Sequence, residues 1–216
     1  MKRVRRRKYS QWRVVAGVVM AGLVWLVWAE TASAANDTTI SSDILQGSCT
    51  LTIQNAGTGA PIASFSLGKY ESADLNTTGA MVGFKPVKLA LSGCGSGGGA
   101  LTPKVELKGT QAQITDVASA NIYTFRNAGA DGGDSHGYFI FVANSTTAKW
   151  NPVSQTGSGD GVWGTGMYIP MAAAGTSGEG ASKTLYLGVG CYSDCLASGT
   201  YAGTVKASLV FEFAYK

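Results

Sequence analysis

The C-terminal stretch of the chain, GTVKASLVFEFAYK from Gly203 to Lys216, has an apolar side chain at every odd position from Val205 to Tyr215. The even positions between them are polar or small in most cases; they are Thr204, Lys206, Ser208, Val210, Glu212 and Ala214. A period of two over more than ten residues is typical of a β-strand with one buried face. The strand runs to the last residue, so we expect its outer edge to be open for pairing with another chain.

The first 34 residues have the pattern of a secretory signal peptide. Seven lysines and arginines up to Arg13 come before an apolar run, Val14 to Trp28, and Ala32-Ser33-Ala34 has the form of a cleavage site. A transmembrane anchor is the alternative, but the run is shorter than the roughly 20 residues that span a bilayer. We expect residues 1–34 to be removed on export, before Ala35.

The formal charge of the chain is +4, and it comes from this leader. Seven of the 17 basic residues and one of the 13 acidic residues lie in the leader, so the remainder carries a charge of −2. The remainder has no basic cluster, which argues against a nucleic-acid partner. Its length suits one domain with a buried core.

All four cysteines, Cys49, Cys94, Cys191 and Cys195, lie in the exported part. An even number of cysteines in an exported chain predicts disulfides, and four cysteines allow three pairings. We favour Cys49 with Cys94 and Cys191 with Cys195, because the second pair closes a small loop. No metal site is expected, since His136 is the only histidine and a second CxxC-type pair is absent.

Residues 35–48, ANDTTISSDILQGS, form a mostly polar arm before Cys49. If the arm is extended, one face carries Thr38, Ile40, Ser42 and Ile44, of which only the two isoleucines are large and apolar. Such a segment cannot order itself alone. We expect it to become a strand only where a partner offers a groove.

Short strands are predicted along the rest of the chain, separated by turn-rich segments. They cover Cys49–Gln54, Ile62–Leu67, Phe84–Leu91, Val105–Lys108, Asn121–Arg126, Gly137–Ala143 and Lys183–Val189. Pro86 suits an edge strand or the start of a strand. No segment shows helical periodicity, and the pattern predicts an all-β sandwich.

Several motifs of the exported part resemble those of a known family. These are the polar arm before Cys49, FSLG at Phe65–Gly68 and VKLALSGC at Val87–Cys94. To these are added a glycine fourteen residues from the end, Gly203, and a penultimate tyrosine, Tyr215. Across essentially the whole exported chain, these features resemble the pilin subunits that the chaperone-usher pathway of Gram-negative bacteria assembles.

The resemblance implies an incomplete immunoglobulin-like β-sandwich that lacks its final strand and is completed by a donor strand. The pilin domain would span residues 49–216, after the signal peptide 1–34 and a donor-strand arm 35–48. In the family, a periplasmic chaperone first lends a strand, and the arm of the next subunit replaces it through the outer-membrane usher. The implied product is a fimbrium on the cell surface that supports adhesion, with neighbouring pilin subunits as partners and a host glycan or receptor as a further candidate.

The resemblance also implies roles for particular residues, none of which is catalytic or binds a cofactor or metal. The donor-strand residues are Thr38, Ile40, Ser42 and Ile44. The acceptor groove and the chaperone-recognised end comprise Leu51, Ile53, Gly203, Leu209, Phe211, Phe213, Tyr215 and Lys216. A large buried apolar side chain is worth roughly 1.5–3 kcal/mol, so an arm with two isoleucines is a modest donor.

Two features depart from the family pattern. The Cys191 and Cys195 pair lies just before the last strand, and the loops between residues 127 and 182 are long and rich in glycine. Both favour a minor or adaptor-like subunit over the main shaft subunit.

Three alternatives remain open from the sequence. Ser135 and His136, within Gly133–Gly137, superficially match a serine-protease loop, but no residue completes a triad and a polar turn is preferred. An adhesin or carbohydrate-binding module would use Trp150, Trp163 and Tyr168 to stack on sugars, but a role for these tryptophans in the core of the sandwich is preferred. A spore-coat U-like secreted β-sandwich would share the strand pattern.

Overall fold

The computed structural model describes residues 47–75, 80–95, 99–112, 122–150, 161–191 and 203–216. These residues all belong to one compact unit, Ile44–Lys216. The expected signal peptide and the donor residues Thr38, Ile40, Ser42 and Ile44 lie outside the described residues.

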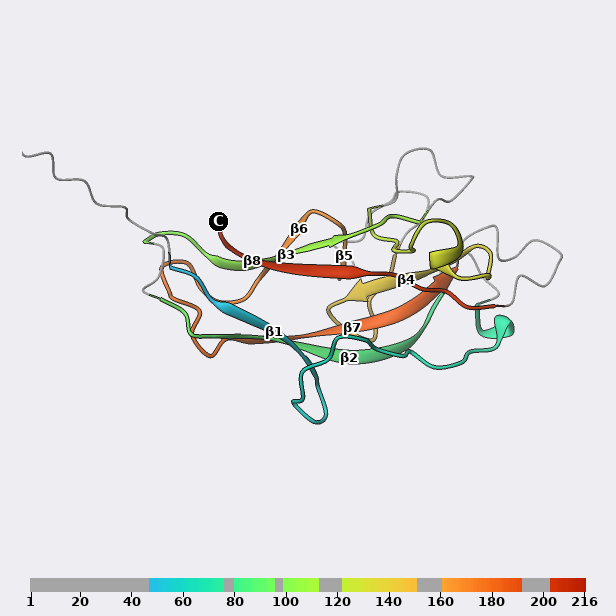
Figure 1. Ribbon diagram of the computed structural model, residues 1–216, viewed down its shortest axis with the longest axis horizontal. Helices are drawn as coiled ribbons and strands as arrows, with labels where there is room; N and C mark the ends of the chain where they lie inside the picture. The colour runs from blue at the N-terminus through green and yellow to red at the C-terminus, as the bar shows by residue number, and fades with distance from the viewer. Residues whose placement is uncertain (1–46, 76–79, 96–98, 113–121, 151–160, 192–202) are drawn as a thin grey trace, which may run out of the picture. The chain divides into compact units, whose positions relative to one another are not determined.

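The described chain forms two antiparallel β-sheets (Figure 1). The five-stranded sheet has the order β1 (Thr50–Asn55), β2 (Met81–Ser92), β7 (Ser182–Cys191), β4 (Tyr138–Ala143) and β5 (Val162–Trp163). The three-stranded sheet has the order β6 (Met167–Pro170), β3 (Pro103–Gly109) and β8 (Leu209–Tyr215). Two short 3-10 helices, η1 (Ser72–Leu75) and η2 (Gly129–Gly132), lie in the connections. The all-β sandwich predicted from the sequence is confirmed.

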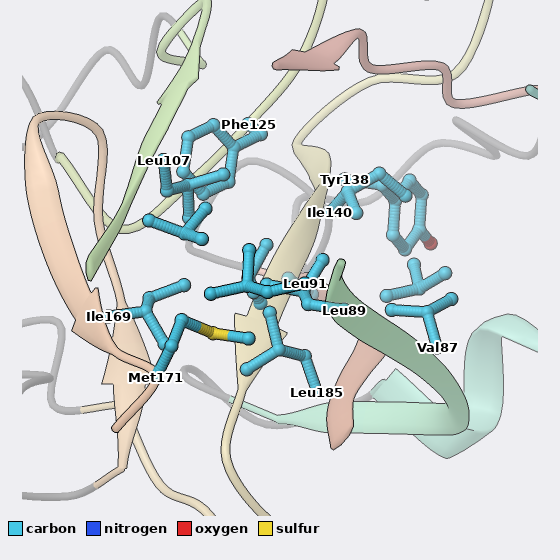
Figure 2. Packing of buried hydrophobic residues seen from close by; sticks show 14 of the residues in the cluster. Val87, Leu89, Leu91, Leu107, Phe125, Tyr138, Ile140, Ile169, Met171 and Leu185 are labelled. Carbon is cyan, nitrogen blue, oxygen red and sulfur yellow. The ribbon is translucent and has the colours of Figure 1, made fainter. Parts of the chain in front are cut away.

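The main core lies between the two sheets, where alternate residues of each strand point inward (Figure 2). Its fully or nearly fully buried members include Val87, Leu89, Leu91, Val105, Leu107, Ile169 and Leu185. Burying each such side chain contributes roughly 1.5–3 kcal/mol, which makes this shared face the main source of stability.

Strand β4 is buried on both faces, which explains its uninterrupted apolar sequence YFIFVA. Tyr138 and Ile140 face the inter-sheet core, whereas Phe139 and Phe141 face a second cluster. Trp150 packs in that second cluster, with its ring centroid 5.5 Å from that of Phe139 and nearly perpendicular to it. The outer face of the sheet is therefore covered at β4.

The disulfide predicted between Cys49 and Cys94 is present. Thr50 pairs with Ser92 in the antiparallel β1–β2 ladder, so the residues that flank the two strands meet at the same end of the sheet. Cys191 is also disulfide-bonded and is fully buried. Its predicted partner, Cys195, lies outside the described residues.

Strand β2 is an interior strand that begins at Met81, so Pro86 lies neither on an edge strand nor at the start of a strand, and that prediction is wrong. The proline is tolerated because β1 ends at Asn55, which pairs with Val87, and no β1 residue lies opposite Pro86. The side of β2 that faces β1 therefore has no ladder at Pro86, the residue that lacks an N–H.

Several predicted strand bounds are also wrong. Ile62–Leu67 makes no strand ladder, the described part of Asn121–Arg126 makes only isolated bridges at Phe125, and the C-terminal strand begins at Leu209 rather than Gly203. Strands β5 and β6 were not predicted, since they lie in a stretch rich in glycine, serine and threonine. No helix in the described part of the chain is long and apolar enough to cross a membrane.

Candidate functional site

The C-terminal segment keeps its two-residue period in three dimensions. Its odd residues are partly buried; they are Val205, Ala207, Leu209, Phe211 and Phe213. Its even residues from Thr204 to Glu212 are exposed, and Val210 has a relative exposure of 50%. One face of this segment therefore belongs to the apolar interior and the other to solvent.

Within the described residues, β8 pairs only with β3, which leaves its other edge open. Lys216 and Thr102 exchange both backbone hydrogen bonds, at 3.0 and 2.9 Å. Hydrogen-bonded pairs recur at every second residue of an antiparallel ladder, so the even residues of β8 bond to β3. The N–H and C=O groups of Leu209, Phe211 and Phe213 consequently point to the open edge.

The open edge continues upstream of β8, because the backbone of residues 203–208 makes its hydrogen bonds on the same side as the backbone of β8. The Thr204 N–H donates to Asp134 Oδ1 at 2.6 Å, and the Lys206 N–H donates to the Gly132 carbonyl at 2.9 Å. The Asn127 N–H donates to the Lys206 carbonyl at 2.9 Å. These bonds again use the backbone groups of even-numbered residues. The backbone N–H and C=O groups of Val205 and Ala207 therefore extend the row that points to the open edge.

Gly203 lies where the chain passes close to this supporting loop. A Cβ atom at Gly203 would lie 2.7 Å from Asp134 Oδ1 and 2.8 Å from the backbone nitrogen of Ser135. Ser135 is 1% exposed, and its hydroxyl donates to the Thr204 carbonyl at 2.9 Å. Ser135 therefore has a structural bond, and the protease-like alternative for this loop loses its nucleophile.

Arg126 holds the supporting loop in place. Its guanidinium donates to the carbonyls of Gly133, Ser135 and Tyr138. Burial lowers the pKa of Arg126, while the nearby Asp134 carboxylate acts in the opposite direction. The arginine thus links the start of β4 to the loop that carries the C-terminal segment.

The Asp134 carboxylate has a pKa below its usual range. The main cause is the hydrogen bond from the Thr204 N–H, followed by its own backbone N–H, with Lys206 and Arg126 contributing by their charge. A depressed pKa means that the ionised carboxylate stabilises the folded state.

A pH dependence follows from this carboxylate. The stabilisation by Asp134 is complete above its unfolded pKa of about 3.9 and is lost as the pH falls through the lower folded value. We expect Asp134→Asn, which keeps an acceptor oxygen but not the charge, to remove this part of the stability and to flatten its dependence below about pH 4. Urea unfolding midpoints of the two strand-complemented proteins between pH 3 and pH 7 test this. An equal dependence of the midpoint on pH in the two proteins would contradict it.

We also expect Gly203→Ala to destabilise the C-terminal segment by about 1–3 kcal/mol, because the added Cβ overlaps the backbone of Ser135. Gly57→Ala is the matched control, since a Cβ there would lie 3.4 Å from its nearest neighbour. Urea unfolding of the two variants, each complemented by a strand, measures the difference. Equal midpoints would mean that the close approach at Gly203 carries no cost.

A second wall faces the open edge and is formed by the extended residues 62–70. Ile62, Phe65, Leu67 and Tyr70 are partly buried and pack against the main core. Tyr70 anchors this wall: its hydroxyl donates to the Leu67 carbonyl at 2.5 Å, and its ring lies over Gly83. Gly83 has a φ of 71° at a bulge in β2, where any side chain would collide with that ring.

A groove of about 1250 Å³ lies between the two walls; we call it the strand groove. Its floor comes from the five-stranded sheet and η1, and is apolar; it consists of Leu75, Val87, Tyr138, Ile140, Leu187 and Val189. One wall is residues 203–209 with Phe211, and the other is residues 62–72 with Ile53. The groove therefore runs beside the open backbone edge from Val205 to Phe211.

The structure brings together part of the predicted acceptor set. Ile53, Gly203, Leu209 and Phe211 line the strand groove. Leu51 and Phe213 pack against the main core beyond the lining of the groove.

The last two residues lie at the end of the sandwich, away from the groove. Tyr215 is 7% exposed, and its hydroxyl donates to the Ser177 carbonyl at 2.8 Å. Its side chain closes this end of the core and leaves only its main chain for a partner. Lys216 is exposed, with its Nζ 5.5 Å from the ring centroid of Tyr168.

The sugar-stacking alternative loses one of its three aromatic residues. Trp150 is 4% exposed and lies against Phe139 and Phe141, so its face is not available to a sugar. The ring of Trp163 is covered by Lys183, whose Nζ lies 5.5 Å from the ring centroid. Within the described residues, no group of three or more potential ligands could hold a metal ion.

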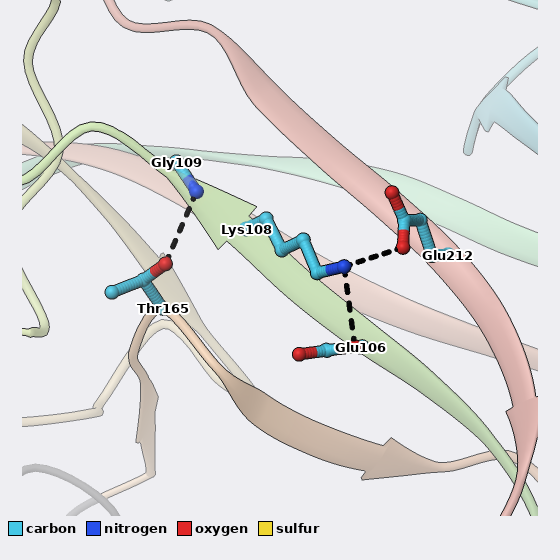
Figure 3. A network of polar contacts seen from close by, with 5 residues as sticks. All are labelled: Glu106, Lys108, Gly109, Thr165 and Glu212. Atoms are coloured by element: carbon cyan, nitrogen blue, oxygen red, sulfur yellow. Dashed lines mark hydrogen bonds and ion pairs between the residues drawn. The ribbon is translucent and has the colours of Figure 1, made fainter.

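The outer face of the three-stranded sheet is charged and lies away from the strand groove (Figure 3). Lys108 Nζ lies 2.6 Å from Glu212 Oε2 and 3.5 Å from Glu106 Oε2, which raises the pKa of the lysine. Exposed pairs of this kind contribute little stability, but they keep the outer face of β8 polar. The two faces of β8 therefore differ in chemistry.

The fold and the site define an all-β sandwich with an open strand edge beside an apolar groove. No protein-family model matches the chain, and no curated protein sequence does. Among solved structures, the chain is similar to the P pilus rod subunit PapA, with a TM-score of 0.47 and 13% identity over 83% of this chain and 99% of that one. It is also similar to a chaperone-usher pilus structure that concerns rod uncoiling, with a TM-score of 0.45 and 16% identity over 85% of this chain and 97% of that one.

Proposed function

We propose that this chain is a structural subunit of a surface fimbria, completed by a strand from another polypeptide that pairs with β8. The observation that carries the proposal is the coincidence of the open edge and the strand groove. An added strand would satisfy the backbone groups of Val205 to Phe213 and cover the partly buried side chains of the same residues. Adding a strand to an exposed sheet edge is a known mode of peptide recognition.

The energies agree with a requirement for such a strand. Each backbone hydrogen bond formed contributes roughly 0.5–1.5 kcal/mol, and each large apolar side chain that enters the groove contributes roughly 1.5–3 kcal/mol. The floor residues Val87 and Ile140 belong to the main core as well as to the groove. Filling the groove would therefore extend the core at this edge.

The assembly route forms part of the proposal. A periplasmic chaperone supplies the first strand, and the arm of a neighbouring subunit replaces it by donor-strand exchange at the outer-membrane usher, on the way to the cell surface. The signal peptide predicted over residues 1–34 supports export. The disulfide at Cys191 and the long glycine-rich loops support a minor or adaptor-like subunit in a fimbrium that serves adhesion.

Co-expression with a candidate periplasmic chaperone tests the function. We expect the chain alone to aggregate or be degraded, and the chain with chaperone to be recovered as a soluble complex. Deleting Phe211–Lys216 should abolish recovery, because it removes most of β8. An unrelated periplasmic chaperone is the control. A stable monomer made without any chaperone would contradict the proposed function.

A further inference from the structure

We propose that the three-stranded sheet binds an acidic saccharide at its β6 edge. The site consists of Lys104, Tyr168, Pro170, Lys183 and Lys216, and we call it the lysine cluster. None of these residues lines the strand groove. The inference therefore goes beyond the strand-accepting role proposed above and assigns a different partner to a second surface.

The ladders of β3 place three members of the cluster on the outer face of the sheet. Tyr168 lies opposite Glu106, and Lys104 is two residues from Glu106 on the same strand, so their side chains share one face. Glu212 also lies opposite Glu106, and Lys216 follows it at an even spacing. Lys216 Nζ lies 5.5 Å from the ring centroid of Tyr168. The tyrosine ring is therefore within reach of the last residue of the chain.

Lys183 reaches the same edge from the five-stranded sheet. It pairs with the fully buried Leu89, so its side chain points to the space between the two sheets. Its Nζ lies 5.5 Å from the ring centroid of Trp163 and donates to the Pro170 carbonyl at 3.4 Å. Pro170 pairs with Lys104 in the β3–β6 ladder. Two lysines from different sheets are therefore neighbours of one residue of β6.

The charges of the cluster are not neutralised by side chains. Within the described residues, Lys104, Lys183 and Lys216 form no ion pair, whereas Lys108 on the same sheet face bonds to two glutamates. Burial lowers the pKa of Lys183, because its ammonium is partly withdrawn from water. The cluster keeps a net positive charge even when the carboxylate at the end of the chain is counted. An anion that bonds to these lysines would supply the missing partner.

An acidic saccharide fits this combination of groups better than an acidic peptide. Tyr168 is partly buried and Pro170 is exposed, so together they offer an apolar surface on the sheet. A sugar ring can place its apolar C–H face against such a surface, with its carboxylate or sulfate at the rim. The lysines lie around that rim and donate charge-assisted hydrogen bonds. A flexible peptide has no rigid flat face and loses more conformational entropy on binding.

Isothermal titration calorimetry of the exported chain tests the inference, with a complementing strand peptide or without one if the chain is stable alone. A salt concentration of about 0.15 M screens charges more than about 8 Å away. The acidic probes are a heparin hexasaccharide and hexagalacturonate; maltohexaose is the neutral probe and hexaglutamate the acidic peptide. We expect at least one acidic sugar to bind, and the neutral sugar and the peptide to bind at least about 10-fold more weakly.

Two lysines on the same strand and the same face provide a matched pair of variants. Lys104→Gln should weaken binding of the acidic sugar by about fivefold or more, because it removes a charge-assisted hydrogen bond. Lys108→Gln makes the same change outside the cluster and should alter binding by less than about twofold. Tyr168→Leu keeps an apolar side chain but removes the ring, and should weaken binding by about threefold or more.

Three results would overturn the inference. These are no binding of either acidic sugar, binding of hexaglutamate as tight as that of the sugar, and equal losses in the Lys104 and Lys108 variants. Each of them would leave the strand-accepting role intact, because that role depends on the strand groove and not on the lysine cluster.

Discussion

Phe211→Glu is expected to abolish capture of a complementing strand while leaving the fold of the rest of the chain in place. Phe211 lines the strand groove and is partly buried, and its backbone groups lie at the open edge. A carboxylate there would be desolvated by the incoming strand without a cationic partner, at a cost of several kcal/mol. Each 1.4 kcal/mol lowers affinity tenfold, so the loss should exceed about 100-fold.

Val210→Glu is the matched control, because Val210 is the adjacent residue on the same strand and points to solvent with 50% exposure. It adds the same charge to the same strand on the outer face, beside the Lys108 and Glu212 pair. Co-purification with a chaperone or a strand peptide measures both variants. Equal capture by the two variants would mean that the inward face of β8 does not contact the partner.

Leu89→Ala is expected to destabilise the sandwich by about 2–5 kcal/mol. Leu89 is fully buried at the centre of β2, where its side chain contributes to the packing between the two sheets (Figure 2). Its truncation removes apolar contacts and leaves a cavity that the surrounding strands only partly fill. A loss of this size is a large fraction of the roughly 5–15 kcal/mol that stabilises a typical domain.

Leu101→Ala provides the control for this substitution, since Leu101 is 38% exposed and the chemical change is identical. Its effect should stay within about 0.5 kcal/mol, as is usual for surface sites. Urea unfolding of the strand-complemented protein gives both values. If Leu89→Ala and Leu101→Ala had the same urea unfolding midpoint, Leu89 would not contribute to the main core.

Both predictions concern the same physical arrangement. Val87 and Leu89 are two residues apart on β2 and share its inward face; Val87 also forms part of the groove floor. The core and the groove are thus one continuous apolar surface. We expect a partner strand to extend the cover that the second sheet provides over Leu89.

Most strands could be predicted from the sequence because their signal is local. The alternation in Leu209–Tyr215 and in β1, the apolar run of β4 and the turn residues between strands all report on neighbouring positions. The Cys49 and Cys94 disulfide was predictable for a related reason, since one alternating segment begins at Cys49 and another ends at Cys94.

The supports of the site could not be predicted in this way. Asp134 and Ser135 bind the backbone of Thr204 across about 70 positions of sequence, and no local pattern connects them. Arg126 in turn holds the loop that carries these two residues. The Ile62–Leu67 segment has the alternation of a strand but forms no ladder with any of the described strands, and it forms a wall of the groove instead. Short strands β5 and β6 have too few residues to show any period.

The sequence by itself determined that the C-terminal segment is a strand with one apolar face, because side-chain alternation is a property of the strand alone. Only the tertiary structure decided which backbone edge of that strand is open. Strand β3 pairs with one edge of β8, and the bonds between Lys216 and Thr102 continue that pairing to the end of the chain. The loop at Asp134 bonds to the same edge of the segment before β8. Hydrogen-bond direction depends on which neighbours the fold brings alongside, and so the open edge and its groove exist only once the two sheets have packed.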